Sequence, residues 1–179
     1  MSDPGAAWRE RSSQRPRGQL CPDCGGALFF DYRGGERPPT CNACGYVRVR
    51  YPGVGVAVIV RDDVGRVLMG KRAQGRYAGL WCIPCGRLEW DEDVREAAVR
   101  EFLEETGLEV ELTGVAAVHS NFHDRERQTV GIWFDGQVTG GRLHPADGEL
   151  SALDYFDPSA PPPLAFPTDA LVLEELAGR

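Results

Sequence analysis

The stretch GRLEWDEDVREAAVREFLEETGL, residues 86–108, decides the fold of this chain. Acidic residues predict that a helix begins at about Asp91 or Glu92 and runs to Thr106. Gly107 suits the left-handed position that commonly ends a helix. Apolar and acidic side chains alternate at helical spacing within it. The stretch therefore predicts a loop followed by one amphipathic helix.

Three carboxylates gather on this predicted helix. Because a helix turns about 100° per residue, Glu101, Glu104 and Glu105 share one narrow arc. Like charges at these spacings repel by a few tenths of a kcal/mol each, roughly. A divalent cation would offset that cost, and clustered hard oxygen ligands suit Mg²⁺ or Mn²⁺. The alternative is a solvated acidic face, the commonest state of charged side chains.

The segments around this helix predict a layered domain. Strands are expected at 54–61 and 66–72, joined as a hairpin, and then at 80–84, 109–118, 129–138 and 150–156. A second helix is expected from Pro167 to Gly178. Strands mixed with two helices, one of them in mid-chain, predict an α/β or α+β fold.

Two Cys-x-x-Cys pairs precede this domain. Their spacing is that of a four-cysteine structural zinc site and resembles a zinc ribbon. So short a segment has too little core to fold alone, which disfavours reduced thiols or a disulfide. Support of the neighbouring domain is the simplest role, and nucleic-acid contact or dimerisation stays open. The cysteines are Cys21, Cys24, Cys41 and Cys44, and the expected parts are a disordered tail at 1–18, the ribbon at 19–50 and the main domain at 51–179.

Composition excludes several classes. The 179 residues are 42% hydrophobic and 26% charged, which is typical of globular chains. The longest apolar run, Val54–Val60, is strand-sized and far below the roughly 18 residues that span a membrane. A net charge of −7 argues against a nucleic-acid-coating surface. The absence of an apolar signal core predicts a cytoplasmic protein.

The pattern Gly86-x5-Glu92-x7-Arg100-Glu101-x2-Glu104-Glu105-x-Gly107 resembles the complete signature of the Nudix hydrolases. The resemblance implies a mixed β-sheet sandwiched between helices. It also implies an enzyme that hydrolyses a nucleoside diphosphate linked to another moiety, with Mg²⁺ or Mn²⁺ as cofactor. By the same resemblance the metal ligands are Glu101, Glu104, Glu105 and the carbonyl of Gly86, and Arg100 pairs with Glu92.

One carboxylate must also accept a proton from the attacking water. Members of the family use either a glutamate of the signature or one on a later loop. Glu149 stands where a late-loop acid is expected, and Glu126 is its rival. Both are equally well explained as ordinary surface acids.

The ribbon and the signature together resemble FAD and ADP-ribose pyrophosphatases. Arg72 is the candidate phosphate contact, Phe122 the candidate base-stacking ring and Gln128 a candidate hydrogen-bonding group. A surface arginine, a core phenylalanine and a loop amide are the plain alternatives. An NADH pyrophosphatase is a second reading, although its Ser-Gln-Pro-Trp run is missing here.

Further readings are a house-cleaning hydrolase of oxidised nucleotides and a non-catalytic ligand sensor whose ribbon contacts nucleic acid or protein. The intact carboxylate set argues against the sensor. Trp81-Cys82-Ile83-Pro84-Cys85 resembles a thioredoxin motif, but a redox cysteine needs a helix N-terminus and a strand is expected here. The expected partner is a small nucleotide, and a homodimer stays open.

Overall fold

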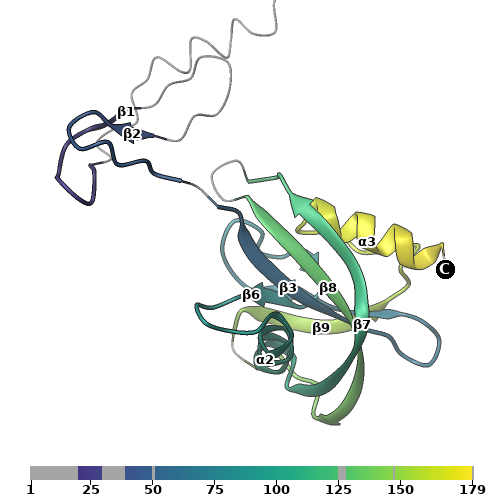
Figure 1. Cartoon of the computed structure of the whole chain (residues 1–179). Coiled ribbons are helices and arrows are strands. Elements are labelled where there is room, and N and C mark those ends of the chain that lie inside the picture. The colour runs from purple at the N-terminus through teal and green to yellow at the C-terminus, as the bar shows by residue number, and fades with distance from the viewer. Residues whose placement is uncertain (1–19, 30–38, 50, 125–127, 147, 179) are drawn as a thin grey trace, which may run out of the picture. The chain divides into compact units, whose positions relative to one another are not determined.

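The computed structural model describes residues 20–29, 39–49, 51–124, 128–146 and 148–178 (Figure 1). The predicted tail at 1–18 and the candidate base Glu126 lie outside these residues. The chain divides between Tyr51 and Pro52 into two compact units, each with a core of its own.

The N-terminal unit is small. Its strands β1 (Leu28–Phe29) and β2 (Thr40–Cys41) form an antiparallel pair. Its core consists of Cys21, Leu28 and Cys41, with Tyr46 packed against them. So few apolar side chains bury little surface, and cysteines make up most of what is buried.

The C-terminal unit contains two sheets. The larger has the order β6–β3–β8–β7, in which β3 and β8 run parallel and the other neighbours are antiparallel. The smaller has the order β5–β4–β9 and is antiparallel throughout. The strands are β3 (Gly53–Val60), β4 (Val67–Arg72), β5 (Trp81–Cys82), β6 (Cys85–Arg87), β7 (Leu108–Asn121), β8 (Thr129–Gly141) and β9 (Leu150–Phe156).

Two helices, α2 (Val94–Thr106) and α3 (Pro167–Ala177), pack on opposite faces of β3 (Figure 1). Because side chains alternate along a strand, Val56 and Val58 pack with α2, whereas Ala57 and Ile59 pack with α3. The predicted α+β fold, with a mixed sheet between helices, is confirmed. No helix in the described segments is long and apolar enough to cross a bilayer.

The predicted hairpin of strands 54–61 and 66–72 is wrong. A single bridge, Arg61 to Val67, joins the two segments. Beyond it β3 pairs with β6 and β8, while β4 pairs with β5 and β9. The long ladders of β3 with β8 and of β4 with β9 join each strand to a distant segment, so the two strands diverge into different sheets after the turn.

Of the predicted strand at 80–84, only Trp81 and Cys82 form a strand, and a separate strand follows it. β5 ends at Cys82 and β6 begins at Cys85, and they belong to different sheets. The backbone N–H of Ile83 between them is taken by a side chain of α3, Asp169, at 3.2 Å. Pro84 has no N–H to offer a sheet. The chain therefore changes sheets at this point.

Helix α2 begins later than predicted. Asp91 has φ 61°, a left-handed conformation that a helix cannot contain. The N-cap is Asp93, whose Oδ1 accepts a hydrogen bond from the Arg95 N–H at 2.8 Å. The predicted C-terminus is correct, because Gly107 caps it with φ 70°. Glu92 consequently lies in the loop and not in the first helical turn.

Candidate active site

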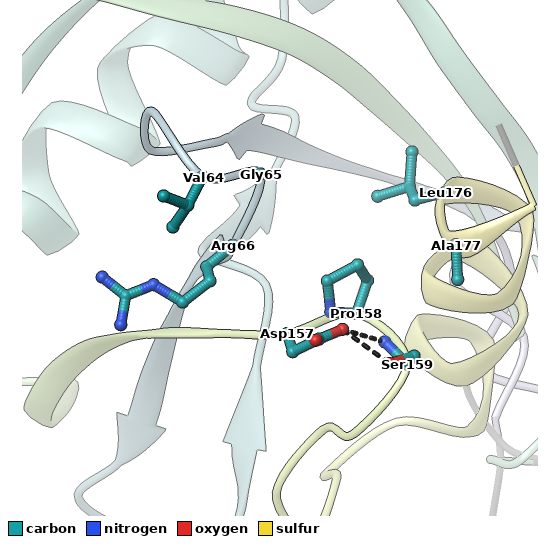
Figure 2. Close-up of a pocket in the computed structure, with 8 residues that line it drawn as sticks. All are labelled: Val64, Gly65, Arg66, Asp157, Pro158, Ser159, Leu176 and Ala177. Atoms are coloured by element: carbon teal, nitrogen blue, oxygen red, sulfur yellow. Dashed lines mark hydrogen bonds between the residues drawn. The ribbon is translucent and has the colours of Figure 1, made fainter.

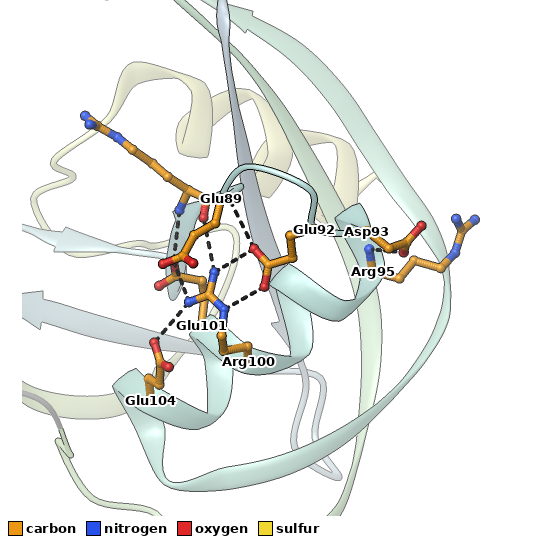
Figure 3. A network of polar contacts seen from close by, with 8 residues as sticks. Glu89, Glu92, Asp93, Arg95, Arg100, Glu101 and Glu104 are labelled. Atoms are coloured by element: carbon orange, nitrogen blue, oxygen red, sulfur yellow. Dashed lines mark hydrogen bonds and ion pairs between the residues drawn. The ribbon is translucent and has the colours of Figure 1, made fainter.

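The loop before α2 is fastened to the helix by a paired arginine and glutamate (Figure 3). Arg100 donates from Nε and Nη2 to the two carboxylate oxygens of Glu92, at 2.7 and 2.9 Å. Glu92 also accepts from the Glu89 N–H at 3.0 Å. The Arg100 hydrogen bonds, followed by that of the Glu89 amide, lower the pKa of Glu92 to about 2. The sequence predicted this pair, which closes the loop onto the helix.

Acid should loosen this loop in a defined pH window. The folded pKa of Glu92, about 2, lies below its ordinary value of 4.5. Its ion pair with Arg100 therefore stabilises the folded protein fully above pH 4.5. This stabilisation is lost as the pH falls from there toward 2. Chemical unfolding across this range should show the free energy of unfolding of the wild type falling toward that of Glu92→Gln. A stability difference that stays constant from neutral pH to pH 2.5 would contradict the pairing.

Two other carboxylates of α2 reach across to β6. Glu101 accepts from the Arg87 N–H at 3.2 Å, and Glu105, only 1% exposed, accepts from the Cys85 N–H at 2.8 Å. Gly86 lies between these two amides. A Cβ at Gly86 would stand 1.9 Å from the carboxyl carbon of Glu101. A side chain at this position would therefore displace the Glu101 carboxylate from its place beside β6.

Negative charge is in surplus at this face. Glu101 and Glu104 both contact Nη1 of Arg100, at 3.0 and 3.1 Å (Figure 3). One guanidinium thus serves these two carboxylates as well as Glu92, while Glu105 lies buried beside them. These carboxylates and the adjacent backbone carbonyls are hard oxygen donors. The donor set fits a divalent ion of the Mg²⁺ or Mn²⁺ type.

A cleft of about 630 Å³ opens beside these carboxylates. Gly86 and Glu101 line one part of it, and Arg72 and Glu149 line it as well. The Arg72 guanidinium lies 3.9 Å from the carboxylate of the half-exposed Glu149. The structure therefore brings the predicted phosphate contact and the predicted late-loop acid into the same cleft as Glu101, whereas Glu104 and Glu105 do not line it.

The other two predicted substrate contacts lie elsewhere. Phe122 is 69% exposed, Gln128 is exposed as well, and neither lines the cleft. The aromatic rings that do line it, apart from Trp133, are Tyr77, His123 and Phe166. Phe166 lies 5.3 Å from the Tyr77 ring and 5.6 Å from that of His123, and Arg72 stands 5.7 Å over it. These three rings are called the aromatic cluster below.

Sequence reasoning also missed Asp169, a buried carboxyl in the cleft wall. It comes from α3, and its Oδ2 accepts from the Ile83 N–H. Burial raises its pKa to about 7, and the amide of Ile83 and the side chain of Trp133 offset part of that rise. The contact ties α3 to the loop that leads into Gly86. A Phe-Pro-Thr-Asp helix start is too ordinary a signal to have revealed it.

The Cys82 and Cys85 thiols lack the environment of a redox pair. Cys82 is fully buried and its thiol donates to the Gly70 carbonyl at 3.7 Å. The neighbouring Cys82 thiol and burial raise the pKa of Cys85 well above its ordinary value. Neither cysteine stands at a helix N-terminus. Protonated, shielded thiols are poor nucleophiles, so the geometry argues against thioredoxin-like chemistry.

The N-terminal unit brings four thiols together. Their sulfur atoms all lie within 4.8 Å of one another. Each Cys-x-x-Cys turn closes alike: Gly25 and Gly45 have φ 71° and 78°, and each donates its N–H to the first cysteine of its pair. The Cys44 amide lowers the pKa of Cys41 to about 7. The cluster, made of Cys21, Cys24, Cys41 and Cys44, fits a tetrahedral zinc ion.

A second hollow, of about 300 Å³, lies at the other end of α3 (Figure 2). Val64, Gly65 and Arg66 form one side of it, and Leu176 and Ala177 form another. Its acid, Asp157, is already bonded to the hydroxyl and amide of Ser159. The hollow holds no carboxylate group comparable to that of α2. The larger cleft is therefore the candidate active site.

Comparison with known proteins agrees with this geometry. A family model described as the NUDIX domain matches residues 51–176. An ADP-ribose pyrophosphatase of Methanocaldococcus jannaschii is 33% identical over 68% of this chain and 72% of its own length. A putative 8-oxo-dGTP diphosphatase of Bacillus subtilis is also 33% identical, over 60% of this chain and 68% of its own length.

A solved structure extends the likeness to three dimensions. The crystal structure of a NUDIX hydrolase from Nitrosomonas europaea superposes with a TM-score of 0.72 at 27% identity, covering 89% of each chain. The range matched by the family model contains the α2 carboxylates, Gly86, Arg100 and Glu92. This chain therefore belongs to the Nudix hydrolase family.

Proposed function

We propose that the protein hydrolyses a nucleoside diphosphate linked to another moiety, in the manner of an ADP-ribose or FAD pyrophosphatase, and releases a nucleoside monophosphate. The supporting observation is one continuous cleft that contains both Glu101 with Gly86 and the aromatic cluster. A diphosphate fits the first part and a base the second. The name of the Methanocaldococcus jannaschii relative agrees with this substrate class.

The proposed roles follow from the contacts. Glu101, Glu104, Glu105 and the Gly86 carbonyl would hold Mg²⁺ or Mn²⁺, which neutralises the diphosphate and acidifies a bound water. Arg72 binds a phosphate oxygen, since it lines the cleft and its ion pair with Glu149 is long, at 3.9 Å. Glu149, 56% exposed and open to the cleft, accepts the proton of the attacking water. Arg100 and Glu92 keep the loop against α2.

The cysteine cluster is proposed to hold a structural zinc ion. Four zinc–sulfur bonds of about 2.3 Å place tetrahedral sulfurs about 3.8 Å apart. The Cys21–Cys44 and Cys24–Cys41 sulfur pairs are each 3.5 Å apart. Four thiolates leave no open coordination position. The zinc would therefore stabilise the N-terminal unit and take no part in hydrolysis.

A substrate panel tests the proposal. With saturating Mg²⁺, kcat/KM is measured for ADP-ribose, FAD, NADH and 8-oxo-dGTP, and products are identified by chromatography. The highest value is expected for ADP-ribose or FAD, with AMP as a product of either. A preference for 8-oxo-dGTP would support the house-cleaning reading that the Bacillus subtilis relative suggests. No turnover by folded, metal-loaded protein would favour the sensor.

A further inference from the structure

Buried polar atoms without a hydrogen-bond partner gather in the cleft. Among the described residues five such side-chain atoms occur, and two of them, on His119 and Asp135, lie 3.1 and 3.2 Å from ion-pair partners. The other three belong to residues that line the cleft; Trp133 Nε1 lies beside the Asp169 carboxyl, whose pKa it lowers, which leaves Asn121 Oδ1 and His123 Nδ1. Because leaving a buried polar group unpaired costs roughly 1–3 kcal/mol, this concentration points to a ligand.

Backbone geometry explains why these side chains face the cleft. Asn121 is the last residue of β7, where it pairs with Thr129 of β8. Side chains alternate in extended chain, so Asn121 and His123 line the cleft while Phe122 between them turns to solvent. The Asn121 amide is held in place, because its Nδ2 donates to the Thr129 hydroxyl at 2.8 Å.

That hydrogen bond fixes what the two side chains offer. With Nδ2 committed to Thr129, the Oδ1 of Asn121 presents an acceptor. The unpaired Nδ1 of His123 presents a donor in the tautomer that carries the hydrogen on that nitrogen. The cleft thus presents an acceptor and a donor near the aromatic cluster.

Among the purines, read along the edge that carries N7 and the group at position 6, this combination matches adenine. Adenine carries an amino donor beside a ring-nitrogen acceptor, whereas guanine shows two acceptors, O6 and N7, along the same edge. We propose that Asn121 and His123 read the amino edge of an adenine base packed against the aromatic cluster, making the cleft selective for adenine nucleotides. The inference rests on the proposed function and names the base of its substrate.

Hypoxanthine provides the sharpest comparison, because it differs from adenine by an oxygen in place of the amino group. That oxygen would face the Oδ1 of Asn121 with no hydrogen between them. A site built to bond a donor rejects the analogue that lacks it. The wild type should therefore prefer ADP-ribose over inosine diphosphate ribose in kcat/KM by at least about tenfold, the equivalent of one hydrogen bond.

Variants of Asn121 test whether this residue causes the preference for ADP-ribose. Asn121→Ala should bring the ratio of the two kcat/KM values to within about threefold, since the acceptor is gone. Asn121→Asp keeps an acceptor oxygen, which the Thr129 hydroxyl can orient, and should retain the preference. Ser120→Ala, at the preceding and exposed position of β7, is the matched control and should leave the ratio unchanged. An equal preference in Asn121→Ala and the wild type overturns the assignment.

A binding measurement separates this inference from the proposed function. AMP and IMP are titrated calorimetrically into the full chain without divalent metal, so that no hydrolysis is required. Tighter binding of AMP, lost in Asn121→Ala, supports the adenine site even if no diphosphate is cleaved. Hydrolysis of both ADP-ribose and its inosine analogue at equal rates, or equal affinity for AMP and IMP, overturns the adenine site and leaves the hydrolase intact.

Discussion

Replacing Glu104 by Gln is expected to lower kcat by about 10³-fold or more. Glu104 is half-exposed and contacts Arg100 at 3.1 Å, an interaction that a glutamine oxygen can keep. The substitution therefore removes a charge and little else. Loss of a ligand to a catalytic metal costs several kcal/mol of transition-state stabilisation, and about 1.4 kcal/mol corresponds to tenfold in rate.

Two control measurements separate the loss of a metal ligand from a loss of folding. The melting temperature should stay within about 2 °C of the wild type, as for surface substitutions away from the core. Glu96→Gln, an exposed glutamate on the same helix, should keep full activity. Glu104→Gln within about tenfold of the wild-type kcat would remove Glu104 from the metal site.

Replacing Cys41 by Ser is expected to abolish zinc binding and to unfold the N-terminal unit. Cys41 is completely buried in a core made largely of cysteine. Structural zinc binding contributes roughly 10–16 kcal/mol of apparent free energy to small domains, which are unfolded without it. Metal analysis should therefore find zinc in the wild type and none in the variant, with a matching loss of proteolytic resistance before Pro52.

Cys85→Ala is the matched control for this experiment. It removes a thiol from the other Cys-x-x-Cys pair, in the C-terminal unit, and should leave the zinc content unchanged. Zinc that disappears with Cys85 but persists in Cys41→Ser would reverse the assignment of the two pairs.

Local patterns in the sequence predicted the α2 region well. The Gly107 cap and the shared face of Glu101 and Glu104 follow from spacing within one helix, and the Glu92–Arg100 pair is implied by the resemblance to the Nudix signature. The exact helix start did not follow, because Asp93 competes with its acidic neighbours as N-cap. That choice depends on the left-handed turn at Asp91.

Features that depend on distant pairing were not predictable in this way. The switch between sheets at Ile83 requires Asp169, 86 residues further along the chain. Similarly, Phe122 looks like a base-stacking ring in the sequence. Only the register of β7 on β8, which pairs Asn121 with Thr129, shows that its two neighbours line the cleft instead. Phe166 joins them from a third segment.

Hydrolysis of ADP-ribose in ¹⁸O-labelled water, followed by mass spectrometry, tests the metal-dependent cleavage of the diphosphate most directly. With Mg²⁺ the products should be AMP and ribose 5-phosphate, one of them carrying a single ¹⁸O, and a chelator should stop the reaction. This result would establish that water attacks one phosphorus of the diphosphate. Folded, zinc-loaded protein that forms neither product with Mg²⁺ or Mn²⁺ would contradict the assignment of this cleft as an ADP-ribose pyrophosphatase site.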